Sequence, residues 1–236
     1  MDLEFPGETT DNIGLCEPGR PMINALIPVK DFAQAKQRLQ SVLSPDERWR
    51  LAEAMFADVL DALASTFDPE CITVVTRDER AIAMAADRHI PVIRESENRG
   101  ETEAVALAVE TLIERDVQTM LIIPGDIPLI TGQDIEKIVE AGCSADVVLV
   151  PSRDGRGTNA ALLTPPNALP LRFGNESFQP HLAAAEARGL RTTVLRLPRV
   201  ALDIDTPADV MALASWPVRT RTQAVLEDIE WAARCR

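Results

Sequence analysis

The fold is decided by a segment in which an apolar run meets a rigid acidic turn, Leu121-Ile122-Ile123-Pro124-Gly125-Asp126-Ile127-Pro128-Leu129-Ile130-Thr131. The run from Met120 to Ile123 has the length of a strand that is buried on both faces, as in a parallel sheet. Pro124 and Gly125 then favour a tight turn, because proline restricts the backbone and glycine permits unusual dihedral angles. Asp126 is therefore expected at the carboxyl end of a central strand, where open α/β sheets bind their ligands. There it would suit a divalent cation held against a phosphate; the alternative is a turn cap before a helix that begins at Thr131.

The rest of the chain alternates apolar runs with helical patterns. The expected strands are 23–29, 71–76, 90–93, 120–123, 145–151, 161–163 and 192–197. Ser44-Pro45-Asp46-Glu47 carries the start signals of a helix, with Ser as N-cap, Pro in the first position and Glu in the third. This rhythm predicts an α/β fold with a doubly wound, mostly parallel sheet.

Composition predicts one domain with two short extensions. A chain of 236 residues with 46% apolar content can bury one large core. Residues 1–21 are polar and lack the apolar stretch of a signal peptide, so they are expected to be a disordered leader or an upstream extension. The domain is expected at 22–215. Residues 216–236 have helical spacing and are expected to dock on the body or to form a homodimer.

Charge and cysteine usage exclude several classes of protein. The formal net charge of −13 argues against a nucleic-acid surface, but local cations and a metal can still bind small anions. No apolar run approaches the ~20 residues of a membrane helix. The four cysteines show neither C-x-x-C spacing nor a zinc pattern, which favours reduced thiols in a cytoplasmic protein.

Three basic residues follow the first expected strand. Lys30, Lys36 and Arg38 are spaced so that a loop folding back over the strand could direct them at one anion. The alternative is a solvated basic turn. A second candidate group is acidic: Asp203 and Asp205 alternate and would point to the same side of a strand end, before a helix capped by Thr206.

The segment after the fifth expected strand contains polar candidates for ligand binding. Gly155, Gly157 and Ala160 match the G-x-G-x-x-A spacing, but an apolar strand follows instead of a helix, which excludes a dinucleotide fingerprint. A turn that presents backbone N–H groups and the Thr158 hydroxyl to a ligand is the better interpretation. Further on, Arg172, Gly174 and Ser177 precede a helix, whose N-terminus is either an anion site or an ordinary cap.

Taken in order, these segments resemble the 2-phospho-L-lactate guanylyltransferase family, which includes phosphoenolpyruvate and 3-phospho-D-glycerate guanylyltransferases. The resemblance covers 22–213 and rests on Ile27-Pro28-Val29-Lys30, Ala35-Lys36-Gln37-Arg38-Leu39, Pro124-Gly125-Asp126-Ile127-Pro128-Leu129, Gly157-Thr158-Asn159, Arg172-Phe173-Gly174-x-x-Ser177 and Asp203-Ile204-Asp205-Thr206-Pro207. It implies a single-domain nucleotidyltransferase fold of the Rossmann-like, GT-A-like kind. It also implies transfer of GMP from GTP to a phosphorylated three-carbon acid, with release of pyrophosphate, in the biosynthesis of coenzyme F-420.

The resemblance also implies roles for individual residues. The expected nucleotide residues are Pro28, Lys30, Lys36, Arg38 and Gly100, and the expected phospho-acid residues are Thr158, Arg172, Gly174 and Ser177. Magnesium is expected on Asp126 and Asp205, and less directly on Asp203. The chain departs from the family at Gly100-Glu101-Thr102, where members usually have a Gly-Leu-Asn segment that contacts guanine and ribose.

Two other functions fit the same residues. One is a nucleotidyltransferase with another acceptor, such as a sugar phosphate or a molybdopterin. The other is a non-catalytic nucleotide-binding protein, although such a protein would not need acids for a metal. Neither nucleic acid nor a membrane is expected as a partner.

Overall fold

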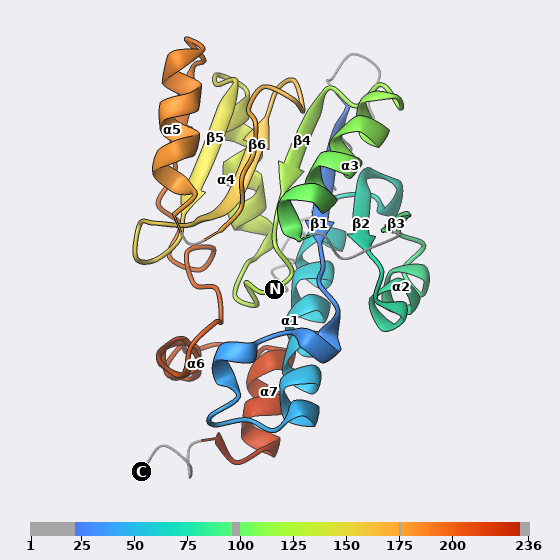
Figure 1. Ribbon diagram of the computed structural model, residues 1–236, viewed down its shortest axis with the longest axis vertical. Coiled ribbons are helices and arrows are strands. Elements are labelled where there is room, and N and C mark those ends of the chain that lie inside the picture. The colour runs from blue at the N-terminus through green and yellow to red at the C-terminus, as the bar shows by residue number, and fades with distance from the viewer. Residues whose placement is uncertain (1–21, 96–99, 175, 232–236) are drawn as a thin grey trace, which may run out of the picture.

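A seven-stranded sheet runs through the part of the chain that the structure describes (Figure 1). The structure is a computed structural model and describes residues 22–95, 100–174 and 176–231, so the predicted leader lies outside the described residues. The strand order is β3-β2-β1-β4-β6-β5-β7, with bounds β1 Ile23–Pro28, β2 Ile72–Thr76, β3 Val92–Arg94, β4 Thr119–Ile122, β5 Val147–Pro151, β6 Thr158–Leu163 and β7 Thr192–Val194. Only β6 runs antiparallel to its neighbours in this sheet of the described residues, which confirms the mostly parallel α/β prediction.

Helices cover both faces of the sheet, and alternating strand residues supply the two cores. Ala25 and Ile27 belong to one cluster, whereas Leu26 between them belongs to the other. The first cluster contains residues of α1 Pro45–Ala64, α2 Glu79–Ala86, α4 Gly132–Gly142, α6 Pro207–Ala214 and α7 Arg221–Asp228. The second contains residues of α3 Glu101–Ile113 and α5 Phe178–Ala187. This two-sided burial explains why the strands read as continuous apolar runs.

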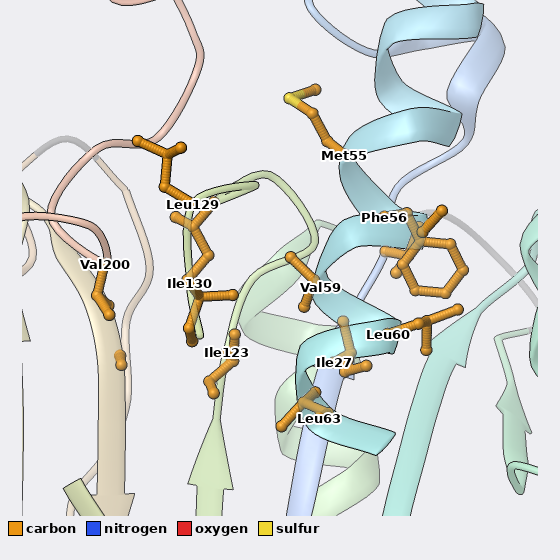
Figure 2. Packing of buried hydrophobic residues seen from close by; sticks show 14 of the residues in the cluster. Ile27, Met55, Phe56, Val59, Leu60, Leu63, Ile123, Leu129, Ile130 and Val200 are labelled. Atoms are coloured by element: carbon orange, nitrogen blue, oxygen red, sulfur yellow. The ribbon is translucent and has the colours of Figure 1, made fainter. Parts of the chain in front are cut away.

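Helix α1 begins where the sequence predicts. Ser44 accepts a hydrogen bond from the Glu47 backbone, and the Glu47 side chain accepts one from the Ser44 backbone, which completes a capping box. Such a cap contributes about 1 kcal/mol. Side chains of α1 then pack on β1 and on the residue after β4: Figure 2 shows Val59 and Leu63 beside Ile27 and Ile123. Each fully buried aliphatic side chain of this kind stabilises the fold by roughly 1.5–3 kcal/mol.

The C-terminal helix α7 lies against α1 of the same chain (Figure 1). The Asp58 carboxylate of α1 accepts hydrogen bonds from the Thr222 backbone and hydroxyl and from the Arg221 backbone, at 2.9, 2.6 and 2.9 Å. Leu226 and Ile229 are buried in the same core. Helix α7 of this tail therefore docks on the body of its own chain.

Three sequence predictions about strands are wrong. Strand β6 begins at Thr158 instead of 161, so Thr158 lies in a strand and not in the predicted turn. Strand β7 ends at Val194 instead of 197, and Pro198 then lacks the N–H that a longer ladder would need. Residues 202–205 form no strand in the described chain. A single backbone hydrogen bond of 3.2 Å from Ile204 N to Asp126 O holds this segment beside the turn after β4.

Two of the four cysteines lie in the described part of the chain. Cys71 is buried and Cys143 is exposed, and neither forms a disulfide with another described residue, whereas Cys16 and Cys235 lie outside the described ranges. Among the helices that the structure describes, none is long and apolar enough to cross a membrane.

The order of the strands places a switch point between β1 and β4. From β1 the chain continues to β2 and β3 on one side, and from β4 it continues to β6, β5 and β7 on the other. Loops that leave the carboxyl ends of β1 and β4 therefore diverge and leave a crevice between them. The loop after β1 carries Lys30, Lys36 and Arg38, and the loop after β4 carries Asp126.

Candidate active site

Lys36 is directed into the molecule by the loop that follows β1. Its backbone is left-handed, with φ of 54°, between the short 3-10 turns η1 Phe32–Gln34 and η2 Gln37–Leu39. Two side chains from other elements hold the loop: Asp78 accepts from the Phe32 backbone at 2.9 Å, and Arg48 donates to the Ala35 carbonyl at 3.2 Å. As a result, the Lys36 side chain is only 7% exposed.

The Lys36 ammonium joins two carboxylates that are distant in the sequence. Lys36 Nζ lies 2.8 Å from Asp126 Oδ2 and 3.0 Å from Asp205 Oδ1. Burial opposes the charge on Lys36, but Asp126 and Asp205 outweigh it and raise the pKa of the ammonium. Burial would likewise raise the pKa of Asp205, but Lys36 and then Arg38, at 3.4 Å, hold it below its ordinary value. Lys36 and Asp205 are therefore both charged at neutral pH.

The donor set at this point fits magnesium. Two carboxylates converge on one positive atom, and Mg²⁺ in proteins is usually held by one or two carboxylates, with water and phosphate oxygens as its other ligands. Asp203 instead accepts from Asn159 Nδ2 at 3.1 Å, and burial, followed by the charge of Asp126, raises its pKa. No group of three or more His, Cys, Asp or Glu side chains forms a metal site in the described part of the chain. Asp126 and Asp205 are thus the two carboxylates that fit a magnesium ion.

A first cavity of about 340 Å³ opens between the loop after β1 and the start of α3. Much of its wall is apolar, and this part includes Val29, Phe32, Ala35, Ala52, Met55 and Ala104. Pro28 at the end of β1 and Gly100 before α3 also line it. Such a wall, with charged groups at one end, suits a ligand with a flat ring and an anionic tail.

A second cavity of about 370 Å³ lies on the other side of the same charged groups. The residues that line only this cavity are mostly polar, and they come from the β5–β6 turn, the 173–174 loop and the 203–209 segment. The two cavities share one set of wall residues, Lys30, Arg38, Glu101, Pro124, Asp126 and Asp205. Ligands in the two cavities would therefore meet at the Lys36-linked carboxylates.

Glu101 lies in this shared wall, at the first position of α3. Its carboxylate is 3.7 Å from Lys30 Nζ, and its side chain is 23% exposed. Burial raises the pKa of Glu101 to about 7; Lys30 opposes this shift and Asp126 adds to it. Glu101 lies in the segment where the chain departs from the family pattern, and the sequence did not predict that it would line both cavities.

The raised pKa of Glu101 predicts how stability depends on pH. Between the unfolded value of 4.5 and the folded value of about 7, the folded chain keeps a proton that the unfolded chain releases, so folding becomes less favourable as the pH rises through this window. At about 1.36 kcal/mol per pKa unit, the full loss is about 3 kcal/mol. Glu101→Gln should remove this pH-dependent loss of stability. The variant should therefore be more stable than the unsubstituted protein above neutral pH but not in mild acid.

Denaturant titrations with a chelator and without nucleotide would measure this effect. The exposed neighbour Glu103 offers the matched control Glu103→Gln. If both variants follow the pH dependence of the unsubstituted protein, Glu101 does not titrate in the predicted window.

The predicted phospho-acid residues are only partly brought together. Thr158 and Gly174 line the second cavity, whereas Ser177 and Arg172 are absent from its lining. Ser177 is buried, and its hydroxyl accepts from the Thr158 backbone at 3.0 Å instead of capping α5. Gly174 has φ of 146°, and an added Cβ would meet no atom within 4 Å, so the backbone conformation and not crowding requires glycine there.

Sequence reasoning missed several polar groups around the second cavity. Arg153 and Arg156 line it, and they pair with Asp209 and Asp154 at 2.6 and 3.0 Å. His181 is a further such group, and its Nδ1 lies 3.0 Å from the Thr158 hydroxyl. The β5–β6 turn and the start of α5 meet only in the folded chain, so no local motif signals this histidine.

Solved structures with low sequence identity share this fold. A nucleotidyl transferase from Methanothermobacter thermautotrophicus is similar over 81% of this chain and 95% of that structure, with a TM-score of 0.60 and 17% identity. A structure described as a nucleotide-diphospho-sugar transferase from Desulfovibrio desulfuricans is similar over 91% and 98%, with a TM-score of 0.73 and 18% identity. The chain therefore has the fold of these nucleotide-utilising transferases.

Sequence relatives narrow the class to one family. The family described as Guanylyl transferase CofC like matches residues 23–234, and the chain belongs to it. It is 37% identical to a phosphoenolpyruvate guanylyltransferase of Sphaerobacter thermophilus, over 80% of this chain and 91% of the relative. It is 36% identical to a 2-phospho-L-lactate guanylyltransferase of Methanothermobacter thermautotrophicus (79% and 81%) and to a 3-phospho-D-glycerate guanylyltransferase of Colwellia psychrerythraea (83% and 93%). The protein is therefore a guanylyltransferase-family enzyme.

Proposed function

We propose that this enzyme transfers GMP from GTP to a phosphorylated three-carbon acid, releases pyrophosphate and serves the biosynthesis of coenzyme F-420 in the cytoplasm. The acid is 2-phospho-L-lactate, phosphoenolpyruvate or 3-phospho-D-glycerate, the acceptors named for the relatives. Magnesium is the proposed metal, and GTP and the acid are the proposed partners.

The proposal rests on one observation above all: two cavities share a wall that contains Lys30, Arg38, Asp126 and Asp205. A transfer between two anionic substrates needs adjoining sites whose common boundary carries groups that offset phosphate repulsion. A protein that only bound a nucleotide would need neither the second cavity nor the paired carboxylates.

The apolar first cavity suits the guanosine, and its charged end suits the triphosphate. Val29, Phe32 and Met55 offer surface for a base, and Lys30 and Arg38 would contact the departing pyrophosphate. Glu101 and Thr102 replace the family's usual Leu-Asn pair, so base selection in this chain depends on a changed segment.

The phospho-acid would occupy the second cavity, with its phosphate toward Asp126. Its phosphate is already ionised, so it can attack the α-phosphorus of GTP without a general base: a P–O bond forms there as the bond to pyrophosphate breaks. Magnesium, when bound to Asp126 and Asp205, would offset the charge of both phosphates and orient them. The turn at Gly157 and the 173–174 loop would position the acid.

Pyrophosphate release tests this proposal. GTP with one of the three acids should give rapid magnesium-dependent release and a product with the mass of the GMP adduct, whereas ATP, CTP and UTP should give much less. Reactions without acid, or with glucose 1-phosphate in its place, are the controls. Pyrophosphate release with GTP and glucose 1-phosphate, but with none of the three acids, would instead favour a sugar-phosphate acceptor. No turnover with any pair of nucleotide and acceptor would contradict catalysis.

A further inference from the structure

His181 is a buried histidine that joins two parts of the second cavity. It is 1% exposed and lies near the start of α5. Its Nδ1 is 3.0 Å from the Thr158 hydroxyl, and its Nε2 is 3.0 Å from the Arg172 backbone nitrogen. The ring of Phe173 packs edge-on against it, with ring centroids 6.0 Å apart.

These contacts determine which ring nitrogen carries the proton. A backbone N–H can only donate, so Nε2 of His181 must accept from Arg172 and must be unprotonated. Burial lowers the pKa of His181 to about 4, so the ring is neutral near pH 7. The single proton of a neutral ring is then on Nδ1 and is donated to the Thr158 oxygen.

The direction of that bond sets the polarity of the Thr158 hydroxyl. Because the oxygen already accepts from His181, the hydroxyl hydrogen remains available to a ligand in the second cavity, which Thr158 lines. With the opposite tautomer, Thr158 would donate to the ring and would present only lone pairs, which repel an anion.

We propose that His181 is a positioning residue that keeps the Thr158 hydroxyl a hydrogen-bond donor and so makes the second cavity selective for an anionic acceptor. The same ring anchors the 172–174 loop through the Arg172 backbone. This inference rests on the proposed function, since it assumes that the phospho-acid binds beside Thr158.

His181→Gln tests it, combined with Thr158→Val. Glutamine can still place an oxygen near the Nε2 position for the Arg172 N–H, but it removes the donor to Thr158; valine has the shape of threonine without the hydroxyl. Either substitution should raise the KM for the phospho-acid by about tenfold, the usual effect of one lost hydrogen bond to a charged group, and leave the KM for GTP nearly unchanged. The double variant should be no worse than Thr158→Val alone.

Additive losses in the double variant, or equal losses for both substrates, would contradict the proposal and show that His181 only supports the fold. A measurement that needs no turnover is the ¹⁵N spectrum of the imidazoles. The chain has two histidines, so comparison with a His89→Gln sample assigns His181. The expected signature at neutral pH is a protonated Nδ1 and a bare Nε2; a protonated Nε2 would overturn the proposal even if His181→Gln failed to fold. If instead the unsubstituted enzyme used no phospho-acid, the proposed function would fail and the tautomer would stand.

Discussion

Asp126→Asn should lower kcat by about 100-fold while the protein stays folded. Asp126 and Asp205 line both cavities and converge on the Lys36 ammonium, so the substitution removes one of two carboxylates that would hold magnesium against the reacting phosphates. A loss of about 3 kcal/mol of transition-state stabilisation corresponds to that factor. Lys36 keeps its contact with Asp205, which limits the effect on folding.

Steady-state rates over a magnesium titration, with melting curves alongside, would measure this effect. Asp205→Asn should give a loss of similar size. Asp154→Asn is the matched control, because Asp154 also lines the second cavity but pairs with Arg156 and not with Lys36. Near-normal turnover of Asp126→Asn at saturating magnesium would show that Asp126 is not a metal ligand.

Lys36→Met should give the largest loss of stability among the substitutions considered, about 3 kcal/mol. The Lys36 side chain is 7% exposed, and its removal leaves Asp126 and Asp205 near each other without the cation that neutralises them. Loss of one partner from a buried pair costs about 3–5 kcal/mol, and the partial exposure of both acids, 32% and 35%, places this case at the lower end. Magnesium should recover part of the loss.

Denaturant titrations of Lys36→Met with and without magnesium would test this expectation, and Arg38→Met is the control. Arg38 approaches the same Asp205 at 3.4 Å, but its side chain is 54% exposed, so its contact contributes less than about 1 kcal/mol. The pKa of Asp205 is lowered in the folded protein, so its contribution is present at neutral pH and disappears in acid. The difference in the free energy of unfolding between Lys36→Met and the unsubstituted protein should therefore become smaller in acid. Equal stability of the two proteins at neutral pH would contradict a stabilising role of Lys36 between the two acids.

The buried link through Lys36 also bears on catalysis. Residues from the loops after β1 and β4 and from the 202–205 segment are tied together before any substrate binds. The fold therefore holds the paired carboxylates near each other at the switch point, so less reorganisation is needed when phosphates and a metal arrive.

The sequence by itself was enough to predict the α/β class and most element starts. Strands that are buried on both faces of the sheet read as continuous apolar runs in the sequence. Local caps, such as Ser44 with Glu47 and Thr131 with Asp134, define helix starts through short-range hydrogen bonds. The same local logic placed Asp126 at a strand end. It did less well where a segment had no local signal, as at 195–197 and 202–205, where Pro198 and the bond from Ile204 to Asp126 decide the path.

Only the tertiary structure decided which charges and hydroxyls meet. Lys36 is separated by 90 and 169 residues from the acids that it joins, and His181 by 23 residues from the Thr158 hydroxyl. No periodicity or spacing encodes such contacts, because they depend on strand order and on how loops cross the carboxyl edge of the sheet. The sequence could identify Lys36, Asp126, Asp205 and Thr158 as candidates through local pattern and resemblance. Burial and hydrogen-bond direction, which give Lys36, Glu101 and His181 their properties, exist only once the chain is folded.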